Sequence, residues 1–290
     1  MQAVAWPSSC KFSRAHRQHL TSIKWHYMQR QVCSARLARP PPATARADTV
    51  PVWETLVIVN SSPEGSQTPE EQQELLDTLW SLQYRTPGAC CASAGPVVKS
   101  AARDSNAAAR AAVYYRFSSQ VQAERFVAGP VFAEAKARLL GTGNVSLALW
   151  KVLVPNDMEA LFKRGPAFET GVDLVLVMQP ASPQQPPAMD AIVEVMGRLQ
   201  RTALAANSLQ VSCGVDVMSL DPRYMWMARF PQEDCAQRFL RSPAVAELAT
   251  GMDIGTAGSA TSEPSRGGAL ALTSLALIEI GAVKQSRQSL

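Results

Sequence analysis

The hydrophobic positions of the chain follow two periods, which predicts strands and helices in a definite order. Segments that alternate with period two, or that are apolar throughout, are followed by segments whose leucines recur at helical spacing, as at Leu75 and Leu79. Thr68 followed by Pro69 is typical of a helix start. The first half is predicted to hold a strand over 55–59, a helix from Thr68, strands over 89–98 and 111–117, a helix over 118–140 that is interrupted at Gly129-Pro130, and a strand over 147–152. This β-α-β-β-α-β order is that of a ferredoxin-like unit.

The same order recurs in the second half of the chain. Arg116-Phe117 and Pro130 reappear as Arg229-Phe230 and Pro243, and both landmarks are displaced by 113 residues. The second half is predicted to hold strands over 173–179, 209–218, 223–230 and 270–280, helices over 189–205 and 233–249, and a surface insertion over 251–268. A shared displacement indicates that one unit of roughly a hundred residues has been used twice.

Several predicted strands are apolar at both parities, so both faces of each sheet should be buried. This holds for residues 56–59, 174–178 and 225–228. The helices cover one face, and the sheet of the other half is the natural cover for the second. The predicted fold class is α+β, with tandem ferredoxin-like βαββαβ repeats whose sheets pack as an intramolecular α/β barrel. The predicted organisation is a transit peptide over 1–50, a first barrel domain over 51–153, a connector with a short helix over 154–168, a second barrel domain over 169–282 and a tail over 283–290.

Positive charge is concentrated at the N-terminus. Residues 1–50 hold eight Lys and Arg and one acid, Asp48, whereas the remaining residues hold 20 basic and 23 acidic ones. An Arg-rich, acid-poor start is typical of an organelle transit peptide, so we expect a chloroplast location, with the mitochondrion as the close alternative. The C-terminal Gln288-Ser289-Leu290 is a weaker pointer to the peroxisome. The charge balance after residue 50 argues against a nucleic-acid partner, and no apolar run is long enough to span a membrane.

The chain offers little acid–base or metal chemistry after its N-terminal segment. Its three histidines are His16, His19 and His26. The cysteines after residue 50 lack the spacing of zinc ligands, and no phosphate-binding or dinucleotide-binding motif is present. We therefore expect no catalytic residue, no cofactor and no metal ligand.

The third predicted strand of each half supplies the candidates for a ligand cavity between the sheets. They are Tyr114, Tyr115, Arg116, Tyr224, Trp226 and Arg229. One of the two adjacent tyrosines should face the helices and the other the space between the sheets. Tyr224 and Trp226 share one parity and could line that space. The arginines could bind an anionic ligand at the barrel mouth or pair with acids such as Glu124 and Glu233, and the aromatic residues could equally be ordinary core.

Together these features resemble the stress-responsive A/B barrel (Dabb) family in its two-copy plant and algal form. The resemblance rests on the repeated βαββαβ pattern, on Gly95 and Gly214 after the first helices, on the Arg-Phe ends of the third strands and on the Pro-centred breaks of the second helices. Val154-Pro155-Asn156 leading to Phe162-Lys163-Arg164-Gly165 is similar to the segment between the domains of that subgroup. The resemblance covers residues 53–281 and implies a dimeric α/β barrel formed within one chain, with a role in the stress response.

The departures from the family pattern concern its histidines. Where family members commonly carry a His after an acid in strand one, this chain has Thr55 and Leu174. The His-Pro-x-His pattern of the second helix is replaced at 129–132 and 242–245. Relatives that act as cofactor-independent cyclases use a His with a Tyr, so their chemistry does not carry over.

The leading hypothesis is therefore a non-catalytic A/B barrel protein that binds a small apolar or aromatic ligand or serves as a structural module. The alternatives are a cofactor-independent cyclase-like or oxygenase-like enzyme that uses Tyr and Arg, and a protein-interaction module. We expect a monomer that is itself a pseudo-dimer, with further oligomerisation left open.

Overall fold

The computed structural model describes residues 49–60, 68–102, 109–140, 145–163, 168, 170–182, 186–249 and 270–280. The predicted transit peptide up to residue 48, the predicted insertion over 251–268 and the predicted tail over 283–290 lie outside the described residues, and these predictions stay untested. Thr49 and Val50, which the charge pattern places in the transit peptide, begin the first strand.

Each half follows the predicted order of elements. The first half holds β1 (Thr49–Asn60), α2 (Pro69–Ser81), the 3-10 helix η1 (Leu82–Arg85), β2 (Ala89–Ala102), β3 (Ala109–Phe117), α3 (Gln120–Ala128), α4 (Pro130–Leu140) and β4 (Val145–Pro155). The connector helix α5 (Met158–Phe162) is followed by β5 (Gly171–Pro180), α7 (Met189–Ala205), β6 (Gln210–Val215), β7 (Tyr224–Phe230), α8 (Glu233–Leu240), α9 (Pro243–Leu248) and β8 (Leu270–Ile280). Gly129 separates α3 from α4, and Ser242 precedes α9, so both predicted helix interruptions are confirmed.

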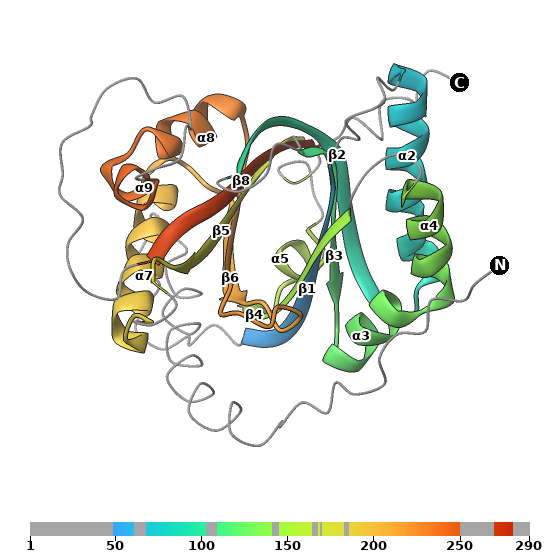
Figure 1. The fold of residues 1–290 in the computed structure, drawn as a ribbon, viewed down its shortest axis with the longest axis horizontal. Coiled ribbons are helices and arrows are strands. Elements are labelled where there is room, and N and C mark those ends of the chain that lie inside the picture. The colour runs from blue at the N-terminus through green and yellow to red at the C-terminus, as the bar shows by residue number, and fades with distance from the viewer. Residues whose placement is uncertain are drawn as a thin grey trace.

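The eight strands form one antiparallel sheet in the order β4-β1-β3-β2-β8-β5-β7-β6. The halves join where residues 97–102 of β2 pair with residues 274–278 of β8. At the opposite edge β6 lies against β4, where the N–H of Val217 donates to the carbonyl of Leu149 at 2.8 Å. The sheet therefore closes almost completely into a barrel (Figure 1), which confirms the predicted fold class.

The second of these seams is shorter than the first because β6 ends early. The predicted strand reaches residue 218, whereas β6 ends at Val215. The carboxylate of Asp216 takes the place of a backbone acceptor there, since it receives the N–H of Leu149 at 2.9 Å and the N–H of Met218 at 3.0 Å. It also forms an ion pair with Arg223. A buried side chain thus continues the hydrogen bonding where the backbone ladder stops.

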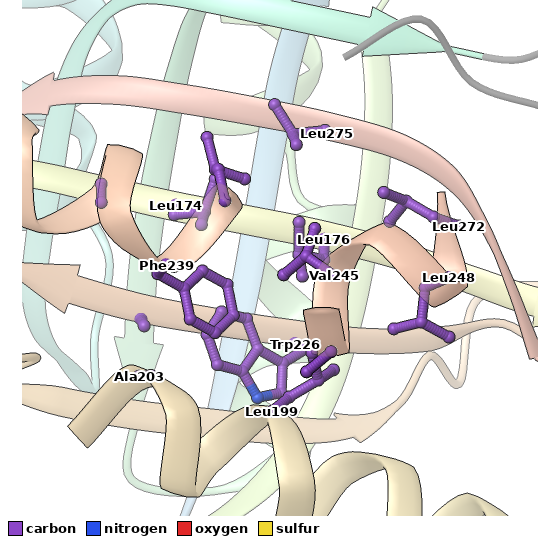
Figure 2. Close-up of a cluster of buried hydrophobic side chains, with 14 of the residues drawn as sticks. Leu174, Leu176, Leu199, Ala203, Trp226, Phe239, Val245, Leu248, Leu272 and Leu275 are labelled. Carbon is purple, nitrogen blue, oxygen red and sulfur yellow. The ribbon is translucent and has the colours of Figure 1, made fainter. Parts of the chain in front are cut away.

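Helices cover the outside of the barrel, and apolar side chains fill both sides of the sheet. Figure 1 shows α2, α3 and α4 beside the strands of the first half, and α7, α8 and α9 beside those of the second. Tyr115 lies in the cluster between the first sheet and its helices, and Trp226 lies in the corresponding cluster of the second half (Figure 2). A third cluster fills the barrel interior with residues of both halves, such as Trp150 and Met227. Both sheet faces are buried, as the strand parity predicts.

The glycines that the repeat places at equivalent positions lie at the two seams. A Cβ on Gly95 would stand 1.6 Å from the carbonyl oxygen of Glu279. A Cβ on Gly214 would stand 2.9 Å from the carbonyl oxygen of Lys151 and 2.6 Å from Cδ1 of Trp150. Only glycine allows the second strand of one half to approach the fourth strand of the other so closely.

Candidate ligand site inside the barrel

The barrel interior contains two ion pairs that are related by the repeat. Glu54 on β1 stands opposite Arg116 on β3, and Asp173 on β5 stands opposite Arg229 on β7. Nη2 of Arg116 lies 2.6 Å from Oε1 of Glu54, and Nη2 of Arg229 lies 2.5 Å from Oδ2 of Asp173. All four residues are completely or almost completely buried. Because residues paired across two strands share a sheet face, the register itself brings each acid to its arginine.

Both carboxylates stay charged despite their burial. Burial by itself would raise the pKa of Glu54, but Arg116 and Lys163 hold that pKa below its ordinary value. Burial acts in the same direction on Asp173, and Arg229 together with Lys163 lowers its pKa below the usual range. The interior is therefore a site of opposed charges and not of neutral polar groups.

Tyr114 is built into the first of these pairs. Its hydroxyl donates to Oε1 of Glu54 at 2.5 Å and accepts a hydrogen bond from Nε of Arg116 at 3.0 Å. Burial raises the pKa of Tyr114 well above its usual value, so the phenol keeps its proton at neutral pH. Of the six predicted candidates, Tyr114, Arg116 and Arg229 face the barrel interior, and the first two are in direct contact.

The connector between the halves lies over this charged cluster. Figure 1 shows α5 within the ring of strands. Nη1 of Arg116 donates to the carbonyl of Leu161 at 3.0 Å, and Nη1 of Arg229 donates to the carbonyl of Phe168 at 2.8 Å. Arg229 also reaches the first half, where its Nη2 donates to Oγ of Ser93 at 2.9 Å. The two arginines thus tie the connector to both halves of the barrel.

Lys163, which directly follows α5, brings a third positive charge into the interior. The residue is only 8% exposed, and its Nζ lies 3.8 Å from the centroid of the Tyr114 ring, which is a cation–π contact. Burial lowers the pKa of Lys163 to about 8; Asp173 opposes this shift, whereas Arg229 and Arg116 reinforce it. Lys163 is absent from the predicted candidates, because its position in a connector carries no strand or helix parity that would direct it inward.

The cluster as a whole lacks one negative charge. Two arginines and Lys163 stand against two carboxylates, and no carboxylate of the described residues forms an ion pair with Lys163. The indole N–H of Trp150, which is in register with Glu54, is buried and has no hydrogen-bond partner in the same part of the chain, and Oε2 of Glu54 is likewise buried without a hydrogen-bond partner there. Buried donors without acceptors are costly. A hydrogen-bond acceptor with a negative charge is the group that this interior would complement.

The other three candidates lie on the helix side of the sheet. The hydroxyl of Tyr115 donates to a backbone carbonyl of α2, and Trp226 stacks on a phenylalanine of α8 with 4.9 Å between ring centroids (Figure 2). Tyr224 belongs to the same helix-side cluster. The expectation that Tyr224 and Trp226 line the space between the sheets is therefore wrong, and Met225 and Met227 occupy that space instead.

The physical reason is strand parity. Trp226 is three positions from Arg229, so the two side chains point to opposite faces of β7, and the buried ion pair takes Arg229 inward. The proposed partners Glu124 and Glu233 are also wrong, since each arginine pairs with an acid of the first strand. The signal that could have found these acids is their own repetition in the equivalent first strands of the two halves.

The described residues set further bounds on the chemistry. None of them form a group of three or more His, Cys, Asp or Glu that could hold a metal ion. No helix within the described ranges is long and apolar enough to cross a membrane. The reactive groups that the interior does offer include a protonated phenol, two paired carboxylates, the buried thiol of Cys91 and the amine of Lys163.

No family model matches the chain, and no curated protein matches it. Among solved structures the chain is similar to a heme-binding protein from Thermus thermophilus, at 11% identity over 84% of this chain and 97% of that chain, with a TM-score of 0.43. It is also similar to a mutant chlorite dismutase from Candidatus Nitrospira defluvii (10% identity, 82% and 94% covered, TM-score 0.44) and to an anthrone oxidase-like protein (11% identity, 81% and 95% covered, TM-score 0.45). These TM-scores lie below 0.5, so no argument about function rests on them. The classification is the one that the structure itself shows: an α+β barrel of two ferredoxin-like halves.

Proposed function

We propose that this protein is a two-copy stress-responsive A/B barrel (Dabb) protein that binds a small molecule inside its barrel without transforming it. The ligand would carry one negative charge on an apolar or aromatic body. The observation that carries the proposal is the buried ammonium of Lys163, which rests on the ring of Tyr114 and forms no ion pair with a described carboxylate. The family assignment is supported by the repeat, by Gly95 and Gly214 at the seams, and by the segment around Lys163.

A ligand carboxylate would satisfy both unmatched donors of the interior. It would neutralise the excess charge at Lys163 and offer an acceptor to the indole N–H of Trp150, and hydrogen bonds to charged groups are the stronger ones. The apolar body of the ligand would have to displace side chains of the packed interior cluster, such as Met225 and Met227. Methionine adapts its shape to irregular apolar ligands.

The test compares benzoate with benzamide, which has nearly the same shape and no charge. Benzoate should raise the melting temperature of the full-length protein, and benzamide should not. Lys163→Met should abolish the shift, whereas Lys136→Met, which removes a partly exposed lysine of α4, should leave it unchanged. Equal shifts with both compounds, or an unchanged shift in the Lys163 variant, would contradict the proposal.

Native mass spectrometry supplies an independent test, because a site with unmatched buried donors should retain its ligand during purification. The expected species is one chain with one small acidic molecule bound. A chain that is empty under all mild conditions, and whose mass corresponds to two or more copies, would favour the protein-interaction hypothesis instead.

One observation favours a catalytic role as the second candidate. The hydroxyl of Tyr114 lies within hydrogen-bond distance of both Arg116 and Glu54, and the amine of Lys163 lies over its ring. If the hydroxyl of Tyr114 acts on the ligand, Tyr114→Phe should retain binding and lose turnover. If the ligand found by mass spectrometry is recovered unaltered after long incubation with the parent protein, the binding role stands.

We also propose import into the chloroplast, on the basis of the charge pattern of residues 1–50. A fluorescent protein fused behind residues 1–50 should accumulate in plastids. Accumulation in mitochondria would support the alternative, and a peroxisomal signal that requires the last three residues would contradict both.

A further inference from the structure

We propose that Lys163 is a covalent attachment point for small carbonyl compounds that carry a carboxylate, with which its side-chain nitrogen forms an imine. This inference rests on the proposed ligand site and deepens it by naming the class of ligand. It depends on the surroundings of Nζ of Lys163.

Lys163 differs from the other lysines of the described part of the chain in its surroundings. Lys99, Lys136 and Lys151 are partly exposed, whereas Lys163 is buried against the face of the Tyr114 ring. The charged and titratable groups that act on it come from five strands: Glu54 on β1, Cys91 on β2, Tyr114 and Arg116 on β3, Asp173 on β5 and Arg229 on β7. The two acids are already engaged by the arginines, so the environment of the nitrogen is that of an excess positive charge.

An amine in such a place is available for chemistry at a pH where ordinary lysines are not. A buried lysine beside other cations loses its proton more easily and becomes a nucleophile toward carbonyl carbon. The pKa of Lys163 is about 8, so a substantial part of it is neutral near pH 8.

The reaction needs no other reagent than the ligand. The neutral amine adds to the carbonyl carbon, the carbonyl oxygen leaves as water, and a carbon–nitrogen double bond remains. Overall, the ammonium and the carbonyl compound yield an iminium ion and water, so neither charge nor electrons are exchanged with a third partner.

The charge balance of the interior selects the class of carbonyl compound. An iminium keeps the positive charge of Lys163, so a neutral aldehyde would leave the excess charge in place. A carbonyl compound with its own carboxylate brings the missing negative charge, and the interior then holds three positive and three negative groups. Taking an unbalanced charge out of water is costly, so the carboxylate should decide which compound is retained.

The experiment uses three two-carbon compounds of nearly equal size on the full-length protein. Glyoxylate has both a carbonyl and a carboxylate, glycolaldehyde has only the carbonyl, and glycolate has only the carboxylate. Each is incubated with the protein at pH 8 in the presence of cyanoborohydride, which reduces an iminium to a stable amine and leaves free aldehydes largely intact, and the modified lysines are identified by peptide mass spectrometry. We expect glyoxylate to modify Lys163 at least tenfold more than Lys136, and glycolaldehyde to show no such preference.

The outcomes separate this inference from the function on which it rests. If glycolate raises the melting temperature but glyoxylate modifies Lys163 no more than Lys136, the covalent step is wrong and the anion site stands. If glycolate, like benzoate, has no effect and Lys163 is unmodified, both proposals fail. The comparison of two lysines within the parent protein needs no variant, and Lys163→Met serves only to confirm that the modified peptide is correctly assigned.

Discussion

Arg116 and Arg229 each carry a full positive charge into the centre of the barrel, where a charge persists only when it is paired. Each pairs with the acid of its neighbouring first strand and also donates to a carbonyl of the connector. Buried ion pairs add little net stability compared with well-packed apolar residues, but removing one partner is costly. These pairs therefore matter most for which strands and which connector atoms come together.

The ion pair between Asp173 and Arg229 offers the cleaner test of whether these pairs hold the strands and the connector together. Arg229→Met should lower the free energy of unfolding by about 3–5 kcal/mol, because it leaves the carboxylate of Asp173 buried without a partner. Adding Asp173→Asn in the same chain should restore part of the loss. Urea denaturation of the parent, both single variants and the double variant measures the coupling.

The control for this experiment is Arg138→Met, which removes an arginine of α4 whose partner Glu134 is also exposed. That change should cost about 0.5 kcal/mol or less, as exposed helix pairs do. If Arg229→Met costs no more than Arg138→Met, the interior ion pair is not what holds the connector and the halves in place.

Because the pKa of Lys163 is lowered in the folded protein, we expect the protein to become more stable as the pH rises. Its pKa is about 8 in the folded protein, below the ordinary value of 10.5, so between these values the folded state binds fewer protons than the unfolded chain. The cost of burying the charge is fully present below about pH 8 and is relieved as the pH rises toward 10.5, by at most about 3 kcal/mol.

The measurement compares the parent with Lys163→Met by urea denaturation at several pH values. The variant should be the more stable protein at pH 7, and the difference should shrink steadily up to pH 10. If the difference in free energy of unfolding does not depend on pH, the pKa of Lys163 is not lowered in the folded state.

At the scale of the elements, the barrel depends on two seams that the repeat makes equivalent but that are built differently. β2 runs past Gly95 and pairs with β8 along residues 97–102, with one register shift between Val97 and Lys99. β6 runs past Gly214 and stops, and the side chain of Asp216 completes the contact with β4. The close approach of backbones at both seams is a property of glycine and not of the surrounding sequence.

Gly95→Ala should therefore weaken the first seam. The added methyl group would meet the backbone of Glu279, which cannot move aside as a flexible side chain could, so the loss should reach about 3 kcal/mol, the upper end of typical overpacking. Thermal and urea denaturation measure it.

The matched control is Gly197→Ala in α7, where a Cβ would meet only the end of the Arg201 side chain at 3.4 Å. That change should be neutral or stabilising by up to about 1 kcal/mol, because alanine is the better helix former. Equal effects at the two glycines would show that the seam tolerates a side chain.

At the scale of the whole molecule, the two halves share one sheet and one interior. The interior cluster draws Leu56 and Trp150 from the first half and Val175 and Met227 from the second. Neither half can open its inner face without exposing that of the other, because the same side chains cover both. The protein should consequently unfold as one cooperative unit despite its duplicated sequence.

Hydrogen exchange in increasing urea tests this expectation. β1 and β5 are the first strands of the two halves. Their slowest amides should exchange through the same global opening, with free energies that agree within about 1 kcal/mol. Exchange of one strand at clearly lower urea than the other would show that the halves unfold separately.

The local elements and the duplication could be predicted from the sequence because both depend on residues that are near one another or that repeat. Thr68 and Glu71 form the capping box that begins α2, and the break at Pro130 is repeated at Pro243. The apolar runs at both parities also led correctly to a barrel with both sheet faces buried.

The candidate site was predicted only in part. Tyr114, Arg116 and Arg229 face the interior, but the side of the sheet on which Trp226 lies was missed, since β7 is buried on both faces and the sequence did not show that Arg229 points inward. Lys163 was missed altogether, because a connector has no period from which a direction could be read.

Periodicity and repetition, which reside in the order of the amino acids, sufficed to predict two ferredoxin-like halves and their mutual cover. Which edges join, which acid meets which arginine, and the entry of Lys163 into the barrel were decided by the tertiary structure. Each of these depends on groups far apart in the chain, such as Asp173 and Phe168 around Arg229, and such groups affect one another only once the barrel has closed and excluded water.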